Sequence, residues 1–255
     1  MTTALITGGT SGIGLGFAHR FAADHHDLVL VARDQPRLER TAAELTDRHG
    51  IRVDTINADL ATTEGCATVE KYLASAAIDV LVNNAGHSLP EPFPRSPLAD
   101  EERMLDLLVR APLRLTHAAI PGMTTRRRGT ILNIASVAGL LPTGTYGAAR
   151  SWLINFSESL RHDLAPFGVR VLAVCPGFTR TAAPHIDTVP DWVWLTVDQI
   201  VKQAMKDLRR NKPRSIAGWH FKLYATAVHH APRRLTARMS RSRRAGVRQK
   251  DSASA

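Results

Sequence analysis

Short apolar runs alternate with longer helical patterns through the first 175 residues, and this alternation limits the fold more than any other feature of the sequence. Each run has the length of a buried strand, and an amphipathic stretch separates it from the next. Strands separated by helices at this spacing form parallel βαβ units, with helices on both faces of the sheet. The sequence therefore predicts a three-layer α/β fold. The predicted strands are residues 4–6, 28–31, 53–56, 80–82, 130–135 and 169–174.

The regular pattern loosens after Pro176. Residues 181–196 are expected to form a loop or lid with short helices. The 255 residues suffice for one α/β domain with a large core, and no linker separates two cores. We therefore predict a single domain over residues 1–228 and a basic, partly disordered tail over residues 229–255.

Charge is concentrated at the C-terminal end of the chain. The net charge is +10, and residues 206–255 hold 14 Lys and Arg against two acidic residues. One interpretation is a solubilising end, since basic, small and polar residues without a hydrophobic pattern favour disorder. A second is peripheral contact with an anionic membrane, and a third is that the aromatic part near Ile216 folds back on the domain. Positive charge without a recognised motif does not predict nucleic-acid binding.

Cysteine and histidine usage bears on compartment and metals. Cys66 and Cys175 are too few for a disulfide framework or a four-thiolate zinc site. We therefore expect a reducing, cytoplasmic location. Neither of the two His-His pairs has a carboxylate or cysteine at ligand spacing, so no metal site is expected. We expect no membrane span and no signal peptide, because no apolar run reaches about 18 residues and no basic region precedes one.

A glycine-rich turn joins the first strand to the first helix. The sequence Thr7-Gly8-Gly9-Thr10-Ser11-Gly12-Ile13-Gly14 leaves room for a tight turn and for close approach of a phosphate to backbone N–H groups. The helix that follows presents the positive end of its dipole to such a group. A strand before the turn and a helix after it are the context that a dinucleotide site requires. A plain tight turn is the alternative.

Several motifs in order make the chain resemble the short-chain dehydrogenase/reductase family, from Ala4 to about Thr181. The motifs are Thr7–Gly14, Asp59 after the third strand, Asn83-Asn84-Ala85-Gly86 after the fourth, Ser136 after the fifth, Tyr146 ten residues later, and Pro176-Gly177 after the sixth. The resemblance implies a Rossmann-type, doubly wound sheet that binds NAD or NADP. It also implies hydride transfer between the nicotinamide and a carbonyl or alcohol.

The end of the second strand bears on the choice of dinucleotide. An acidic residue there accepts hydrogen bonds from a ribose 2′-OH, whereas an arginine pairs with the 2′-phosphate of NADP. Arg33 lies 19 residues after Gly14, with Asp34 next to it. We expect NADP(H) to be preferred, with NAD(H) as the alternative. By resemblance, the cofactor-binding residues are Gly8, Thr10, Ser11, Gly12, Ile13, Gly14, Arg33, Asp59 at the adenine, Asn83 at the adenosine, Ala85, Gly86, Tyr146, Arg150, Pro176, Gly177, Thr179 and Thr181 at the nicotinamide carboxamide.

The resemblance also assigns the catalytic residues, with two departures from the family pattern. Tyr146 is expected to deliver a proton to the carbonyl oxygen and Ser136 to position that oxygen. The pKa of free tyrosine is about 10, so a cation must stabilise the phenolate. Where the family has a lysine this chain has Arg150, which keeps the charge but cannot pass on a proton. Where the family has a relay asparagine it has Leu108, which cannot hydrogen-bond a water.

Two functions stay open at this point. One is a working reductase that receives protons by another route, and the other is an NADP-binding protein with weak or no turnover, acting as a sensor, subunit or scaffold. The interval from Ser136 to Tyr146 is also about three residues shorter than in close relatives, which bears on the register of the two side chains.

Residues 181–228 form, by resemblance, the variable region that covers the substrate. Trp192 and Trp194 in this region suit a small apolar carbonyl or alcohol, although capping of the core is an alternative role for them. His87, just past Gly86, is expected to line the same pocket.

Family members associate through two long helices, here predicted at Glu101–Met123, with Pro112 as a candidate kink, and at Ala148–Leu164. The resemblance therefore implies a homodimer or homotetramer.

Overall fold

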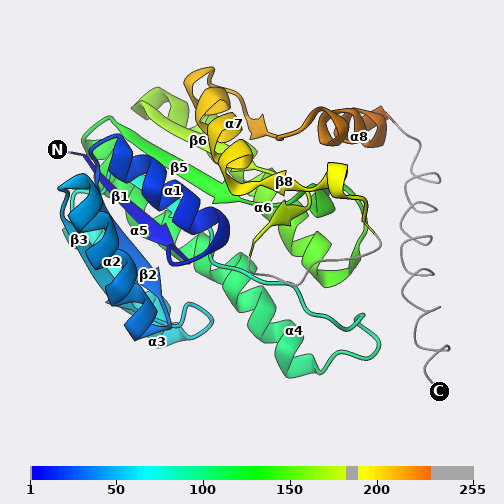
Figure 1. Ribbon diagram of the computed structural model, residues 1–255, viewed down its shortest axis with the longest axis horizontal. Coiled ribbons are helices and arrows are strands. Elements are labelled where there is room, and N and C mark those ends of the chain that lie inside the picture. The colour runs from blue at the N-terminus through cyan, green and yellow to red at the C-terminus, as the bar shows by residue number, and fades with distance from the viewer. Residues whose placement is uncertain (1, 182–188, 231–255) are drawn as a thin grey trace.

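A computed structural model of the protein describes residues 2–181 and 189–230. Its centre is a seven-stranded parallel sheet with the strand order β3-β2-β1-β4-β5-β6-β9 (Figure 1). The predicted α/β, three-layer fold is confirmed. The strands are β1 (Thr3–Thr7), β2 (Asp27–Ala32), β3 (Val53–Asn57), β4 (Val80–Asn83), β5 (Gly129–Ile134), β6 (Val169–Val174) and β9 (Arg214–Ser215).

Helices cover both faces of this sheet. On one face lie α1 (Gly12–Ala23), α2 (Gln35–His49) and α7 (Val197–Arg209), and α1 packs against both of the others. On the other face lie α3 (Thr63–Ser75), α5 (Ala111–Thr125) and α6 (Gly144–Leu164), where α3 packs against α5. Figure 1 shows α1 and α7 in front of the strands and α5 behind them.

Alternation of side chains along the strands builds two separate cores. In β1, Ala4 and Ile6 belong to a cluster with Phe17 of α1, whereas Leu5 belongs to a cluster with Leu115 of α5. All five side chains are fully or almost fully buried. Apolar residues on both faces of a strand are typical of a parallel sheet sandwiched between helices.

The segment predicted as one long helix is divided in the structure. Helix α4 (Leu98–Leu105) passes through a π-helical turn, Asp106–Arg110, into α5. Pro112 lies in the first turn of α5, where its missing N–H group leaves a gap in the hydrogen-bond ladder. A π-turn accommodates such a gap without ending the helix. The kink expected at Pro112 therefore takes the form of a wider turn just before it.

The segment after β6 is largely irregular. A two-stranded pair joins β7 (Thr179–Arg180) to β8 (Leu195–Thr196), with a short 3-10 turn, Asp191–Val193, before β8. The predicted lid with short helices lies here, and its residues 182–188 fall outside the described part of the chain. Helix α8 (Trp219–His230) follows β9. Of the predicted tail, residues 231–255 also fall outside the described part.

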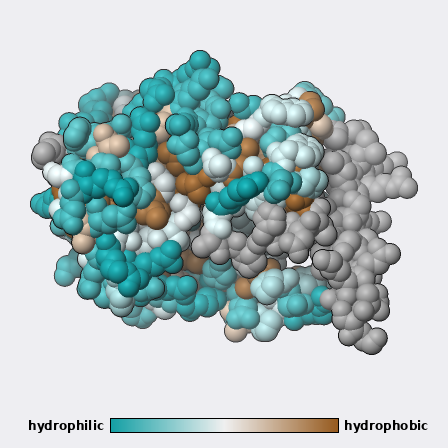
Figure 2. All heavy atoms as spheres, in the orientation of Figure 1, coloured by the Kyte–Doolittle hydropathy of each residue, from teal (hydrophilic) through white to brown (hydrophobic). Residues whose placement is uncertain are grey.

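The visible face of the molecule is mostly hydrophilic, and hydrophobic atoms gather near its middle, where α1 and α7 meet (Figure 2). None of the helices in residues 2–181 and 189–230 has the length and apolar character that crossing a membrane requires.

Candidate functional site

The glycine-rich turn lies at the carboxyl edge of the sheet, between β1 and α1. Gly8 and Gly12 have φ angles of +64° and +52°, which favour glycine over any other residue. A Cβ atom on Gly14 would overlap the carbonyl oxygen of Gly8. The backbone at Gly8 and the backbone at Gly14 therefore pack directly against each other. Thr10 is buried within the turn, and Ile13 packs against the core below it.

The N-terminal end of α1, like that of α6, has no side-chain cap and no acidic residue in its first turn. Ser11 is the residue that precedes α1. Asp34, Thr62 and Thr196 by contrast cap α2, α3 and α7 through their side chains. The first N–H groups of α1 are therefore open to an anionic ligand. A cradle of this shape and polarity fits the pyrophosphate of a dinucleotide.

Asn84 holds the glycine turn from the neighbouring strand. Its side-chain amide donates to the carbonyl oxygens of Thr7 at 2.9 Å and Gly8 at 3.2 Å. The Thr7 hydroxyl accepts from the backbone N–H groups of Asn84 and Ala85, at 2.9 and 3.0 Å. Sequence reasoning missed the roles of Asn84 and Thr7. A signal was present, because Thr7 ends the first strand and Asn84 directly follows the fourth, both at this edge.

Asn83 faces the interior instead of the cofactor side expected for it. Its side-chain amide donates to Thr116 of α5 at 3.0 Å and to Asn133 of β5 at 2.8 Å. Asn133 in turn donates to Ser157 of α6 at 2.9 Å. Since successive side chains of a strand point to opposite faces, Asn83 joins the sheet to α5 and α6, while Asn84 stands at the edge. The structure therefore does not bring the Asn83 side chain to the predicted adenosine position.

Arg33 and Asp59 lie at the ends of the neighbouring strands, β2 and β3. Arg33 is exposed and forms no ion pair with any residue in the described part of the chain. The carboxylate of Asp34 accepts the backbone N–H of Arg37 at 3.0 Å and is therefore used to cap α2. This arrangement leaves the guanidinium of Arg33 available at the position where a 2′-phosphate is expected.

The Asp59 side chain is held by an ion pair with Arg103 of α4. Burial alone would raise the pKa of Asp59, but the backbone N–H of Ala61 and the guanidinium of Arg103 hydrogen-bond its carboxylate and leave the pKa lowered. Asp59 is therefore a fixed negative charge at the carboxyl end of β3.

Ser136 lies between the ends of β5 and β6. Its hydroxyl accepts the N–H of Ala138 at 3.1 Å and donates to the carbonyl of Pro176 at 3.4 Å. The second bond is long, so the hydroxyl proton can turn to a substrate oxygen at small cost. The Pro176 carbonyl also accepts the N–H of Val137 at 2.9 Å, which ties the two strand ends together.

Tyr146 and Arg150 lie one turn apart on the first part of α6. The guanidinium carbon of Arg150 is 5.1 Å from the centroid of the Tyr146 ring. Arg150 is only 6% exposed, and its Nη1 donates to the carbonyl oxygen of Ile134 at 2.9 Å. A Cβ on Gly139 would lie 2.7 Å from backbone atoms of Arg150 and Ser151. The short turn that begins at Ser136 therefore packs directly on the part of α6 that carries Tyr146 and Arg150.

Leu108 fills the space beside Arg150. A Cβ on Gly86 would lie 2.6 Å from Arg150 Nη2 and 2.6 Å from Leu108 Cδ2, so these three residues meet at one point. Leu108 is fully buried, with Met104 and Tyr146 in the same apolar cluster. The Nε atom of Arg150 is buried without a hydrogen-bond partner in the described residues. Leu108 itself offers no hydrogen bond to a water molecule beside the tyrosine.

An aromatic cluster covers the turn after β6. A Cβ on Gly177 would overlap the ring of Phe221 from α8. The ring centroid of Phe178 lies 5.4 Å from that of Trp194 and 6.4 Å from that of Phe221. Trp192 is 65% exposed, and its ring meets that of His220 edge-on at 5.6 Å. Phe178 and Phe221 were not predicted, because nothing in the local pattern around 221 indicates that it packs on the turn at 177.

The remaining predicted residues complete the rim. The Thr179 hydroxyl donates to the Gly177 carbonyl at 3.0 Å. A Cβ on Gly12 would lie 3.3 Å from Thr181 Cγ2, so Thr181 reaches the glycine turn from the far side. The imidazole of His87 has a lowered pKa, first because of partial burial and then because of Arg33, Arg103 and Arg150. It therefore stays neutral at pH 7.

Apart from Asn83, the predicted residues thus surround one edge of the sheet. In residues 2–181 and 189–230, no group of three or more His, Cys, Asp or Glu side chains could hold a metal ion.

Comparison with known sequences gives a consistent result. The family described as short chain dehydrogenase matches residues 2–187. A very-long-chain 3-oxoacyl-CoA reductase of Pyrenophora tritici-repentis is 35% identical over 194 residues, which are 72% of this chain and 57% of that protein. Sulfoacetaldehyde reductase 2 of Chromohalobacter salexigens is 38% identical over 194 residues, 73% of this chain and 76% of that protein. The chain spans less than two thirds of two fungal oxoacyl-CoA reductases that it matches, 57% and 64%.

Solved structures with similar folds include two dehydrogenases. A short-chain dehydrogenase from Sphingobium yanoikuyae in complex with NADPH has a TM-score of 0.84 and 34% identity, covering 100% of this chain and 96% of that one. The bulky-bulky ketone specific alcohol dehydrogenase from Comamonas testosteroni has a TM-score of 0.80 and 31% identity, covering 100% and 95%.

Proposed function

Because the chain belongs to the short-chain dehydrogenase family, we propose that it is an oxidoreductase that transfers a hydride between NADP(H) and an apolar carbonyl or alcohol. One observation carries the proposal. Ser136 begins the short turn that packs on the part of α6 with Tyr146 and the buried cation of Arg150, at the sheet edge that also holds the uncapped glycine turn. A dinucleotide site and an acid with its cation are the two parts that carbonyl reduction requires.

The chain's own residues divide the work as follows. The bound nicotinamide supplies the hydride. Ser136 donates a hydrogen bond to the substrate oxygen, and Tyr146 transfers its hydroxyl proton to the same oxygen. Arg150 stabilises the phenolate that remains, through a guanidinium 5.1 Å from the ring centroid. Since Leu108 offers no hydrogen bond to an internal water, the phenolate would recover its proton from solvent on the open side of the site.

We propose NADP(H) as the preferred cofactor because Arg33 is exposed and unpaired among the described residues while Asp34 is used as a helix cap. The glycine turn, Ala85 and Gly86 would hold the adenine dinucleotide on one side, and Thr179 and Thr181 on the other. The structural neighbour from Sphingobium yanoikuyae, whose structure contains NADPH, supports this assignment.

The substrate is proposed to be apolar and bulky. Phe178, Trp194 and Phe221 form an aromatic wall beside Gly177, with Trp192 at its rim. Aromatic walls with few polar groups favour apolar ligands. The reductase relatives named for very-long-chain 3-oxoacyl-CoA and the neighbour named for bulky ketones agree with this class.

A second candidate function is NADP binding with weak or no turnover. The observation that favours it is the contact of Gly86, Leu108 and Arg150, which replaces a hydrogen-bonded relay by apolar packing. In this case the protein would bind the cofactor as a sensor, subunit or scaffold.

The test is a fluorescence titration with NADPH followed by NADPH oxidation against a panel of apolar ketones and aldehydes. Wild type is compared with Tyr146→Phe and Arg150→Lys. Binding with turnover that Tyr146→Phe abolishes supports the enzyme. Binding without turnover, with turnover gained in Arg150→Lys, supports the second function. Failure to bind either NADPH or NADH contradicts both.

Self-association and location are also proposed. Three leucines are exposed on neighbouring helices: Leu98 (68%) and Leu105 (36%) on α4, and Leu113 (44%) on α5. These apolar residues support a homodimer or homotetramer that forms through α4 and α5. Light scattering after gel filtration would test it. The free, buried thiols of Cys66 and Cys175 support a cytoplasmic location.

A further inference from the structure

Helix α8 carries apolar residues on two opposite faces. Phe221 on one face is buried against the turn at Gly177, and Tyr224 packs on the same core. Trp219 and Leu223 on the other face are exposed by 71% and 64%. These two residues are four positions apart and therefore lie side by side on the helix surface. In Figure 2 the surface over α8 is pale to brown, unlike the hydrophilic surface over α7.

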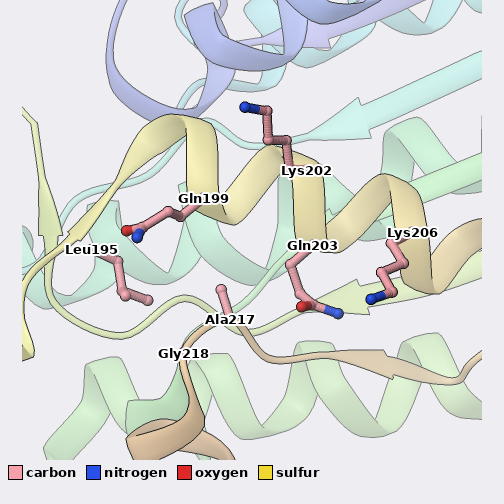
Figure 3. A pocket seen from close by; sticks show the side chains of 7 residues that line it. All are labelled: Leu195, Gln199, Lys202, Gln203, Lys206, Ala217 and Gly218. Atoms are coloured by element: carbon pink, nitrogen blue, oxygen red, sulfur yellow. The ribbon is translucent and has the colours of Figure 1, made fainter.

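A groove with both polar and apolar lining adjoins the exposed face of α8. It has a volume of about 300 Å³ and runs between α7 and the segment before α8, lined by Gln203, Lys206, Ala217 and Gly218 among others. Figure 3 shows Gln203 and Lys206 extending from α7 toward this segment. Lys222 of α8 reaches back to the groove and donates to Oε1 of Gln203 at 3.3 Å.

Positive charge on this surface is not neutralised by nearby acids. Lys206 and Lys222 form no ion pair within residues 2–181 and 189–230. The neighbouring acid, Asp207, is buried, with 2% of its surface exposed. Its carboxylate accepts hydrogen bonds from Ser215 and Gln203 and forms an ion pair with Lys212. The sequence beyond α8, residues 231–255, adds eight Lys and Arg and one Asp. Charge over the whole region is therefore strongly positive.

We propose that this surface, formed by Lys206, Trp219, Lys222 and Leu223, docks on an anionic phospholipid bilayer. Tryptophan and leucine beside lysines are the side chains that bind the interface of such a bilayer, with the rings at the level of the headgroups. Lys206 in the groove wall and Lys222, which contacts Gln203 of the same wall, would bind the phosphate of a lipid headgroup. A neutral protein surface would match the apolar pair but not the excess of positive charge, so charge complementarity favours the anionic lipid.

Docking through α8 would place the substrate wall close to the membrane. The face of α8 opposite Trp219 and Leu223 holds Phe221 on the Gly177 turn. One helix therefore separates the lipid surface from the aromatic wall of the site. A substrate dissolved in the bilayer would enter beside this helix.

The experiment is co-sedimentation of the full chain with vesicles. One set contains phosphatidylcholine alone, and the other contains phosphatidylcholine with about a third phosphatidylserine. We expect binding to the second set only, weakened by added salt because screening shortens the reach of surface charges. Lys206→Gln with Lys222→Gln should lower the partition coefficient about 10- to 30-fold, from a loss of about fivefold per basic residue near an anionic surface. Trp219→Ala with Leu223→Ser should lower it by about tenfold or more.

Phe167→Ser with Lys71→Gln is the matched control, because it removes one exposed apolar and one exposed basic residue elsewhere on the surface. NADPH titration and circular dichroism of each variant show that it is folded, and neither readout depends on turnover. Equal binding to both vesicle sets, no binding to either, or full binding by both α8 variants would overturn the proposal. The last result would assign the lipid contact to residues 231–255. If the wild type does not bind vesicles but forms oligomers that Trp219→Ala with Leu223→Ser loses, the surface is an interface between copies of the chain.

Discussion

Replacement of Arg150 by methionine isolates the contribution of the buried cation to the proposed reaction. Methionine keeps most of the apolar stem and removes the charge. Two unit charges separated by the 5.1 Å between the guanidinium carbon and the ring centroid interact by about 3 kcal/mol at an effective dielectric constant of about 20. This energy corresponds to a factor of roughly 200 in rate if the phenolate forms in the transition state. We therefore expect Arg150→Met to lower kcat by about two orders of magnitude.

The assay is NADPH oxidation with the best ketone of the panel, measured with urea unfolding for each variant. Arg126→Met is the matched control. Arg126 also donates through a guanidinium nitrogen to a backbone carbonyl, that of Ile78 at 2.7 Å, and its Nε is also buried without a partner among the described residues. It lies at the end of α5, away from the carboxyl edge. Each variant should lose about 1.5–3 kcal/mol of stability, the typical contribution of a charged donor.

Only Arg150→Met should lose activity beyond what unfolding explains. The reasoning is refuted if Arg150→Met stays within about threefold of wild type in kcat while Tyr146→Phe is inactive, because 3 kcal/mol should cost far more. Equal losses of activity in Arg150→Met and Arg126→Met would assign the effect to stability alone.

Three further outcomes are expected. Arg33→Ala should weaken NADPH binding about 10- to 100-fold in a fluorescence titration and leave NADH binding nearly unchanged, since only NADPH offers a 2′-phosphate; equal weakening would contradict the assignment. Burial alone would raise the pKa of Asp207, but hydrogen bonds from its neighbours lower it, so its contribution to stability is present above about pH 4 and is lost as pH falls through the lower folded pKa. Urea unfolding of Asp207→Asn should therefore show a loss at pH 7 that shrinks below pH 4, and a loss independent of pH would contradict this. Burial raises the pKa of the Cys175 thiol to about 12 and also raises that of Cys66. An aromatic disulfide reagent at pH 8 should therefore label neither thiol until the protein unfolds. Rapid labelling of the native protein would be inconsistent with this burial.

Long apolar runs could be located from the sequence, and short elements could not. The predicted strand at 169–174 matches β6 to the residue because all its inward side chains are apolar. Strand β9 has only two residues, Arg214 and Ser215, and leaves no apolar pattern. The π-turn before α5 also escaped prediction, because it is only five residues long and lies between two stretches with a helical pattern.

The location of site residues at the ends of strands could be predicted from the sequence, because every parallel strand ends at the same edge of the sheet. Parallel strands deliver Gly8, Ser136 and Pro176 to one edge whatever the loops between them. The direction of a side chain at a strand end is less certain. Asn83 points to the interior instead of the adenosine position, and Asn84, for which no role was predicted, holds the glycine turn. The packing of Phe221 on Gly177 depends on contacts between distant segments, which a local pattern does not contain.

The position of β1 in the sheet has a consequence for synthesis on the ribosome. β1 pairs with β2 on one side, and on the other side Ala4 pairs with Val80, far along the chain. The first three strands can therefore assemble early, while the second edge of β1 stays open until β4 emerges. An open apolar strand edge in a growing chain invites pairing with other chains. Slowing translation after β3 has left the ribosome but before β4 has done so should thus increase aggregation of nascent chains more than slowing it after β4 has emerged.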